Sequence, residues 1–342
     1  MGKILVTGGT GYIGAHTVVE LQNNGYEVVI VDNLSNSDIK ILTQIETITG
    51  KKPAFVKLDL RDKLSIVEFL KGHTDISGVI HFAASKSVSE SVKNPLLYYD
   101  NNISTLVNLL NALAGKTVNF VFSSSCTVYG EPDTLPVTEL APIKKAESPY
   151  GNTKQIGEEI LNETANANND LKVIALRYFN PVGAHESALI GELPNGVPQN
   201  LVPFITQTAI GKREQLTVFG DQFDTPDGSC IRDFIHVVDL AKAHVAAIRR
   251  MEAQQMAASF EVFNVGTGNG YSVLELIRTF EEVTGQPLNY LIGPPRDGDI
   301  VKIWGDVNLA EKELNWKAEQ GLASMLASAW AWEEYINNNP FN

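Results

Sequence analysis

Near the N-terminus, three regularly spaced glycines separate a short apolar run from a helical pattern. Gly8, Gly11 and Gly14 follow the run at 3–6 and lie at the start of a helix predicted over Ile13–Asn24. Glycines at such a junction permit a tight turn and let backbone N–H groups approach a pyrophosphate at the helix N-terminus. A glycine triplet alone is often only a turn, but its place between strand and helix makes the phosphate-binding interpretation strong.

Short apolar runs alternate with helix-length segments through the first half of the chain. They lie at 3–6, 27–31, 54–56, 78–82, 119–122 and 173–176. This alternation predicts βαβ units and a parallel sheet that is buried on both faces. Beyond about residue 180 the pattern is less regular, and we predict a strand at 260–264 and an amphipathic helix at 272–284 ending at Gly285.

The predicted fold is therefore α/β, with a Rossmann-like doubly wound parallel sheet and a smaller C-terminal α/β substrate lobe. We expect the sheet domain to comprise residues 1–180 and the lobe residues 181–342, with segments of the two interleaving.

The charge and the cysteine content exclude several classes of function. A net charge of -13 argues against nucleic acid and against an anionic membrane as partners. The six histidines show no clustered spacing, so we expect no metal site. No apolar stretch approaches the roughly 18 residues of a membrane helix, and the two cysteines, Cys126 and Cys230, suit a reducing cytoplasm.

An acidic residue ends the second predicted strand and indicates which dinucleotide binds. Asp32 lies 18 residues after Gly14, where a carboxylate binds ribose hydroxyls and would repel a 2′-phosphate, so NAD is favoured over NADP. Residues 33–37 would form the loop around the adenosine ribose. Asp59, after the third strand, would either contact the adenine or cap the next helix, and the sequence leaves both interpretations open.

A tyrosine and a lysine four residues apart predict acid–base chemistry. Tyr150 and Lys154 would share one face of a helix, and a nearby cation favours the phenolate of a tyrosine whose free pKa is about 10. Ser123–Ser125 end the strand at 119–122, where side chains line the ligand crevice of a parallel sheet. Serines at a strand end are usually turn formers, but together with Tyr150, Lys154 and the glycine motif they predict a nicotinamide-dependent enzyme.

With these motifs, the chain resembles the extended short-chain dehydrogenase/reductase superfamily, and within it the UDP-glucose 4-epimerase family. The resemblance runs through nearly the whole chain, to about residue 316. It is carried by residues 7–14, 32–34, 81–86, 98–102, 123–130, 148–154, 177–184, 200–201, 232–237 and 296–299.

The resemblance implies a redox-neutral cycle on NAD, in which a UDP-hexose is oxidised at C4 and reduced again on its other face. It implies Tyr150 as the base, Ser125 as a proton relay and Lys154 as the cation that lowers the pKa of Tyr150 and holds the nicotinamide ribose. The implied NAD-binding residues are Gly8, Gly11, Tyr12, Ile13, Gly14, Asp32, Asn33, Leu34, Ser35, Asn36, Ser37, Asp59, Leu60, Phe82, Ala83, Ala84, Lys86, Asn101, Ser125, Tyr150, Lys154 and Phe179. The implied substrate-binding residues are Lys86, Ser125, Thr127, Tyr150, Asn180, Asn200, Leu201, Thr217, Val218, Phe219, Arg232, Arg296, Asp299 and Ile303.

The resemblance also implies a homodimer, which the helices at 96–114 and 150–167 would form, and it makes Ile303 a determinant of sugar selectivity. A UDP-N-acetylhexosamine epimerase remains an alternative, as do a dehydrogenase that exchanges NAD with solvent and a non-catalytic nucleotide-binding protein. A nucleotide-sugar dehydratase is disfavoured, because Cys126 and Thr127 stand where that reaction needs an acid and a base.

Overall fold

The computed structural model describes residues 2–296 and 300–341 and contains one seven-stranded parallel sheet, here called the main sheet. Its strand order is β11-β6-β5-β4-β1-β2-β3. The strands are β1 (Lys3–Thr7), β2 (Val28–Asp32), β3 (Ala54–Lys57), β4 (Ile76–His81), β5 (Val118–Ser123), β6 (Leu171–Tyr178) and β11 (Phe260–Val265). Every strand predicted from an apolar run is confirmed, and the predicted doubly wound α/β fold is confirmed with them.

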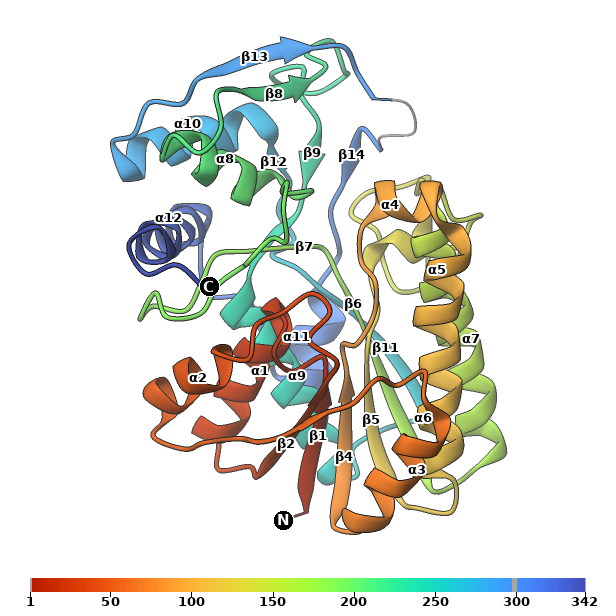
Figure 1. Cartoon of the computed structure of the whole chain (residues 1–342). Helices are drawn as coiled ribbons and strands as arrows, with labels where there is room; N and C mark the ends of the chain where they lie inside the picture. The colour runs from red at the N-terminus through yellow and green to blue at the C-terminus, as the bar shows by residue number, and fades with distance from the viewer. Residues whose placement is uncertain (1, 297–299, 342) are drawn as a thin grey trace.

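The main sheet is buried on both faces because consecutive apolar side chains of a strand point to opposite sides. In β1, Ile4 and Val6 belong to one hydrophobic core and Leu5 to the other. One face is covered by α1 (Tyr12–Asn23), α2 (Ile41–Thr49), α9 (Val237–Glu252) and α11 (Asn308–Leu314) (Figure 1). The other face is covered by α3 (Lys63–Gly72), α6 (Thr105–Leu113) and α7 (Pro149–Ala167). The short helices α4 (Val88–Lys93) and α5 (Pro95–Tyr99) pack against α7.

Smaller sheets and three helices form the C-terminal lobe, which lies above the main sheet in Figure 1. The strands are β7 (Asn180–Val182), β8 (Leu216–Phe219), β9 (Ile231–Arg232), β10 (Phe234–His236), β12 (Tyr271–Ser272), β13 (Tyr290–Gly293) and β14 (Lys302–Ile303). They pair as β10-β7, β12-β9-β14 and β13-β8. The helices α8 (Leu201–Ala209), α10 (Val273–Thr284) and α12 (Leu322–Asn338) share a core that includes Ile205, Phe280 and Met325.

The predicted helix at 272–284 is confirmed as α10, and its ends follow from its sequence. Ser272 and Glu275 form a capping box at the N-terminus, and Gly285 ends the helix with a φ of 68°. The predicted strand at 260–264 is confirmed as β11, although it pairs with β6 in the main sheet. Elements from both halves of the chain thus build the main sheet and its layers, while the division at residue 180 stays a prediction.

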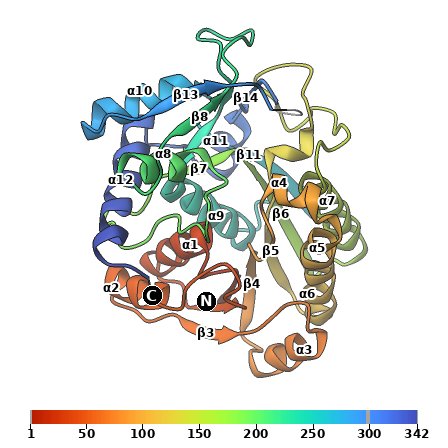
Figure 2. The same cartoon turned by 45° about the horizontal axis from the view of Figure 1, so that its top comes forward.

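The carboxyl ends of β1, β4, β5 and β6 point toward the C-terminal lobe, so residues that follow these strands face that lobe (Figures 1 and 2). Within the described ranges, no helix combines the length and the hydropathy that crossing a membrane requires.

Candidate active site

The turn between β1 and α1 and the start of α1 require glycine at positions 8 and 14. Gly8 has a φ of 71°, and a Cβ there would lie 2.8 Å from the backbone nitrogen of Ala83. A Cβ on Gly14 would lie 2.2 Å from the carbonyl oxygen of Gly8. Gly11 precedes the first turn of α1, and no side chain caps this helix. The backbone N–H groups at the start of α1 are therefore available to donate hydrogen bonds to an anionic group.

Asp32 at the end of β2 organises the next loop. Its carboxylate accepts hydrogen bonds from the backbone of Leu34 at 2.9 Å, from Ser37 Oγ at 3.2 Å and from the backbone of Thr10 at 3.3 Å. Leu34 has a φ of 61°, a strained value for a leucine. Asp32 thus ties the glycine turn to the loop 33–37, in which Ser35 and Asn36 are exposed.

Asp59 does not cap a helix, so that interpretation is wrong. Asp62 caps α3, accepting from the backbone of Leu64 and Ser65. Asp59 instead pairs with Arg61 at 2.7 Å, and this hydrogen-bonded guanidinium lowers the pKa of Asp59 to about 2. Asn33 donates to the same carboxylate at 3.2 Å, which places Asp59 beside the loop that Asp32 organises. Contact of Asp59 with an adenine stays a prediction.

Ser125, Tyr150 and Lys154 come together where β5 ends and α7 begins. Ser148 caps α7 by accepting from the backbone of Gly151 at 3.1 Å, which sets the first turn that carries Tyr150. Lys154 Nζ donates to the carbonyl of Ser123 at 2.6 Å and lies 5.8 Å from the centroid of the Tyr150 ring. All three side chains are buried, with Ser125 6%, Tyr150 8% and Lys154 4% exposed.

Burial dominates the acid–base properties of this group. It raises the pKa of Tyr150 well above the ordinary value, while hydrogen bonding with Ser125 acts in the opposite direction. Burial lowers the pKa of Lys154 to about 8, partly offset by the negative charge of Glu158. Burial of the phenolate is the largest influence on the pKa of Tyr150 in the chain alone. The expectation that Lys154 lowers this pKa stays a prediction.

A buried ion pair anchors α7, the helix that carries Tyr150 and Lys154. Glu158 lies one turn after Lys154 and accepts two hydrogen bonds from Arg177, at 2.9 and 2.5 Å, and one from Ser124 Oγ at 2.5 Å. This bidentate pair joins α7 to β6 and to the serine cluster after β5. Sequence reasoning gave Glu158 and Arg177 no role, although Glu158 stands at i+4 from Lys154 and so on the same helical face.

Hydrogen bonds fix the loop after β4 against α7. Asn102 accepts from the backbone of Ser85 at 2.8 Å and donates to Thr153 Oγ1 at 3.0 Å, while Asn101 donates to Ser85 Oγ at 3.1 Å. The same loop carries the predicted cofactor residues Phe82, Ala83, Ala84 and Lys86. Tyr12 and Ile13 lie in the first turn of α1, Leu60 is buried after β3, and Phe179 is buried after β6.

The predicted substrate residues lie on the small strands and on the loops that join them. Arg232 in β9 and Ile303 in β14 are register partners, and Ile303 packs against Cys126 and Phe179. The guanidinium of Arg296 lies 4.6 Å from the centroid of the Phe219 ring. The other members are Thr127 after β5, Asn180 in β7, Asn200 and Leu201 at the start of α8, and Thr217 and Val218 in β8. Asp299 lies outside the described residues.

Two further acidic residues lie among these side chains, and sequence reasoning missed both. Asp233, next to Arg232, accepts from the backbone and the hydroxyl of Thr267 at 2.8 and 2.7 Å, and burial raises its pKa to about 6. Glu192 accepts from Lys86 and from Asn200. Within the described ranges, no group of three or more histidine, cysteine or acidic side chains could hold a metal ion.

Comparison with known proteins places these features in a family context. Residues 4–266 match the NAD dependent epimerase/dehydratase family. The UDP-glucose 4-epimerase of Erwinia amylovora is 47% identical over 332 residues, which cover 97% of each chain. The crystal structure of UDP-glucose-4-epimerase from Stenotrophomonas maltophila with bound NAD and formylated UDP-arabinopyranose is 48% identical, with a TM-score of 0.95, covering 99% of this chain and 100% of that one. The UDP-glucose 4-epimerase from Bifidobacterium longum in complex with NAD+ and UDP is 46% identical, with a TM-score of 0.94 and the same coverage.

Proposed function

Because the chain belongs to the NAD dependent epimerase/dehydratase family, we propose that it interconverts UDP-galactose and UDP-glucose by inverting C4 through a transient 4-keto sugar. The observation that carries this proposal is the convergence of Ser125, Tyr150 and Lys154 at the end of β5, in the same sheet whose β1 leads into the glycine turn. The chain also matches a UDP-glucose-4-epimerase over 99% of its length.

The residues around the glycine turn fit NAD. The start of α1 is uncapped, a Cβ on Gly14 would fill the space beside the Gly8 carbonyl, and Asp32 ends β2 as the ribose-binding carboxylate of such folds does. When bound, NAD accepts a hydride from C4 and returns it to the opposite face. Glycine N–H groups would hold its pyrophosphate, and Lys154 its nicotinamide ribose.

The chain's own residues would move one proton. Tyr150 would take it from the 4-hydroxyl, directly or through Ser125, and return it after the ketose has turned. Lys154, fixed by the Ser123 carbonyl, would orient the tyrosine and stabilise its phenolate. Burial opposes that phenolate in the chain alone, and the positive charge of an oxidised nicotinamide would favour it.

The nucleotide half of the substrate would be held firmly while the hexose turns. Arg232 and Arg296 suit a diphosphate because guanidinium groups pair with phosphate oxygens in a fork geometry. The aromatic ring of Phe219 beside Arg296 adds a flat apolar surface. Asn180, Asn200 and Asp299 would also bind the UDP portion of the substrate.

The decisive experiment is an NMR time course of the purified protein with UDP-galactose and no added cofactor. We expect the anomeric signals of UDP-glucose to appear until the two sugars reach equilibrium. A 4-keto-6-deoxy product would identify a dehydratase, free NADH a dehydrogenase, and unchanged UDP-galactose a binding protein. Each of these three results contradicts epimerisation. Repeating the experiment with UDP-N-acetylglucosamine tests the hexosamine alternative.

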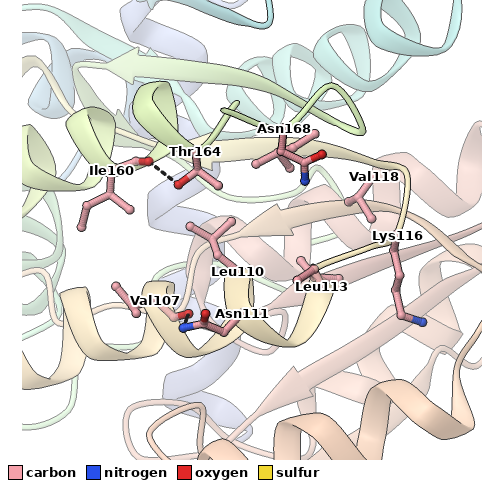
Figure 3. Close-up of a pocket in the computed structure, with 11 residues that line it drawn as sticks. Val107, Leu110, Asn111, Leu113, Lys116, Val118, Ile160, Thr164 and Asn168 are labelled. Carbon is pink, nitrogen blue, oxygen red and sulfur yellow. Dashed lines mark hydrogen bonds between the residues drawn. The ribbon is translucent and has the colours of Figure 1, made fainter. Parts of the chain in front are cut away.

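We also propose that the protein is a homodimer formed through α5, α6 and α7. Leu96 is 81% exposed and Val107 37% exposed on this face. A pocket of about 220 Å³ opens between α6 and α7, lined by apolar side chains that include Val107, Leu110 and Ile160 (Figure 3). Apolar surface of this kind favours association. Light scattering of the wild type and of Leu96→Asp would test it, and a monomeric wild type would contradict it.

A cytoplasmic location is the last part of the proposal. Cys126 and Cys230 are both buried as thiols, which suits a reducing compartment. Fractionation of cells followed by an assay for UDP-galactose conversion would test the location.

A further inference from the structure

Glu192 lies where residues predicted to bind NAD and residues predicted to bind UDP meet. It belongs to the segment between β7 and α8, and its side chain is 12% exposed. The same carboxylate oxygen, Oε1, accepts from Lys86 Nζ at 2.9 Å and from Asn200 Nδ2 at 2.6 Å. Lys86 comes from the loop after β4, and Asn200 precedes α8. One oxygen atom thus joins a side chain of the main-sheet layers to one of the C-terminal lobe.

The backbone around Glu192 is anchored on both sides. Its carbonyl accepts from Trp332 Nε1 at 2.8 Å, which fixes it against α12. Tyr12, in the first turn of α1, donates to the carbonyl of Gly183 at 2.6 Å, and the Lys86 ammonium lies 5.9 Å from the centroid of the Tyr12 ring. The glycine turn, Lys86 and the segment of Glu192 therefore form one connected group.

Glu192 is part of a contact between the two lobes and is not one of the side chains proposed to move the proton. A carboxylate is not expected to bind the phosphates of NAD or UDP, because like charges repel. It can, however, hold the ammonium and the amide in place while the ligands are absent. Because one oxygen holds both groups, a ligand that moves Lys86 or Asn200 changes the contact of the other, and such a dependence couples two binding sites.

We propose that Glu192 is a positioning residue that couples NAD retention to UDP binding by holding Lys86 and Asn200 at one point. This inference rests on the proposed function, because it assumes that Lys86 contacts NAD and that Asn200 contacts the UDP portion. It predicts that bound UDP slows the release of NAD and that NAD release loses this dependence when the charge on Glu192 is removed.

The test uses the holoenzyme and measures the rate of NAD release with and without saturating UDP, by capture of the released cofactor. The ratio is the rate of NAD release without UDP divided by the rate with UDP. For the wild type we expect this ratio to exceed about 5, the lower end of the usual range of couplings between sites. Glu192→Gln keeps the shape of the side chain and removes its charge, and we expect the ratio to fall toward one. Glu186→Gln removes an exposed charge from the same segment and is the matched control, with a ratio like that of the wild type.

A double-substitution cycle separates coupling from a merely structural effect. In a Lys86→Met background, Glu192→Gln should change the ratio no further, because its partner is already missing. If Glu192→Gln left the ratio unchanged, for example by raising both rates by the same factor, the inference would be overturned. So would a wild-type ratio near one. A wild-type protein that holds no NAD or binds no UDP would instead refute the proposed function, so the two failures can be told apart.

Discussion

Replacing Gly14 by alanine tests how tightly the turn before α1 is built. The added Cβ would lie 2.2 Å from the carbonyl oxygen of Gly8 and 2.9 Å from the Cα of Gly9, both backbone atoms. Ordinary van der Waals contact begins at 3.4 Å, so backbone atoms must separate by about 1.2 Å. The turn or the first turn of α1 has to move, because no flexible side chain is available to give way.

The displacement has two costs of different size. Overpacking of this kind typically lowers the free energy of unfolding by about 1–3 kcal/mol. A shift of about 1 Å also takes an N–H group out of hydrogen-bonding range of a phosphate oxygen, and losing one hydrogen bond to a charged group costs about 1.5–3 kcal/mol. For each such bond lost, we expect the affinity for NAD to fall by a factor of about 10 to 150.

The assay measures NAD content after purification, NAD affinity by titration calorimetry and stability by chemical unfolding. Gly72→Ala is the matched control, since a Cβ on Gly72, the last residue of α3, meets nothing within 4 Å. It should match the wild type in NAD content and NAD affinity, and its free energy of unfolding should be equal or up to about 1 kcal/mol higher. A Gly14→Ala protein with wild-type NAD affinity would refute the reasoning, because the glycine would then be dispensable for the shape of the turn.

Three further predictions concern the proton, the sugar and acid stability. Tyr150→Phe should reduce turnover on the order of 100- to 10,000-fold while NAD content and UDP affinity by calorimetry stay near wild type; near-normal turnover would show that another group is the base. Ile303→Tyr should remove any activity on UDP-N-acetylglucosamine and Ile303→Ser should raise it, and equal kcat/KM ratios in all three proteins would show that this buried residue does not border the hexose. Burial lowers the pKa of four histidines to about 3 or 4, and they are His16, His81, His236 and His244. They are neutral in the fold and charged in the unfolded chain below about pH 6.5, whereas Asp233, with a pKa raised to about 6, takes up a proton in the fold and partly offsets them. Chemical unfolding should therefore show a loss of about 4–5 kcal/mol between about pH 7.5 and pH 5.5, and a stability that does not change over this range would contradict the assignment.

Local patterns in the sequence were sufficient to predict the strands of the main sheet and the helix α10. An apolar run, a capping box and a terminal glycine each act within a few residues of the chain. The convergence of Ser125 with Tyr150 and Lys154 also followed, because a strand end and the next helix start meet at the same edge of a parallel sheet.

Features that depend on distant contacts could not be predicted. The sequence showed that residues 260–264 form a strand, but not that β11 pairs with β6. Glu158 and Glu192 look like solvated charges until their partners on other elements are known. The burial of Tyr150 could not be predicted for the same reason, since the depth of burial is a property of the whole fold and not of a four-residue spacing.

The pairing of β11 with β6 has a consequence for the synthesis of the protein. These strands share six register pairs, from Phe260–Val173 to Val265–Tyr178, and β6 lies between β5 and β11. Until residue 265 has left the ribosome, β6 is an open edge with unpaired backbone groups and apolar side chains on both faces. Such an edge is a template for pairing with other chains. The nascent polypeptide thus carries an aggregation-prone edge through the translation of more than eighty further residues, and a chaperone that covers β6 during this interval would protect it until β11 arrives.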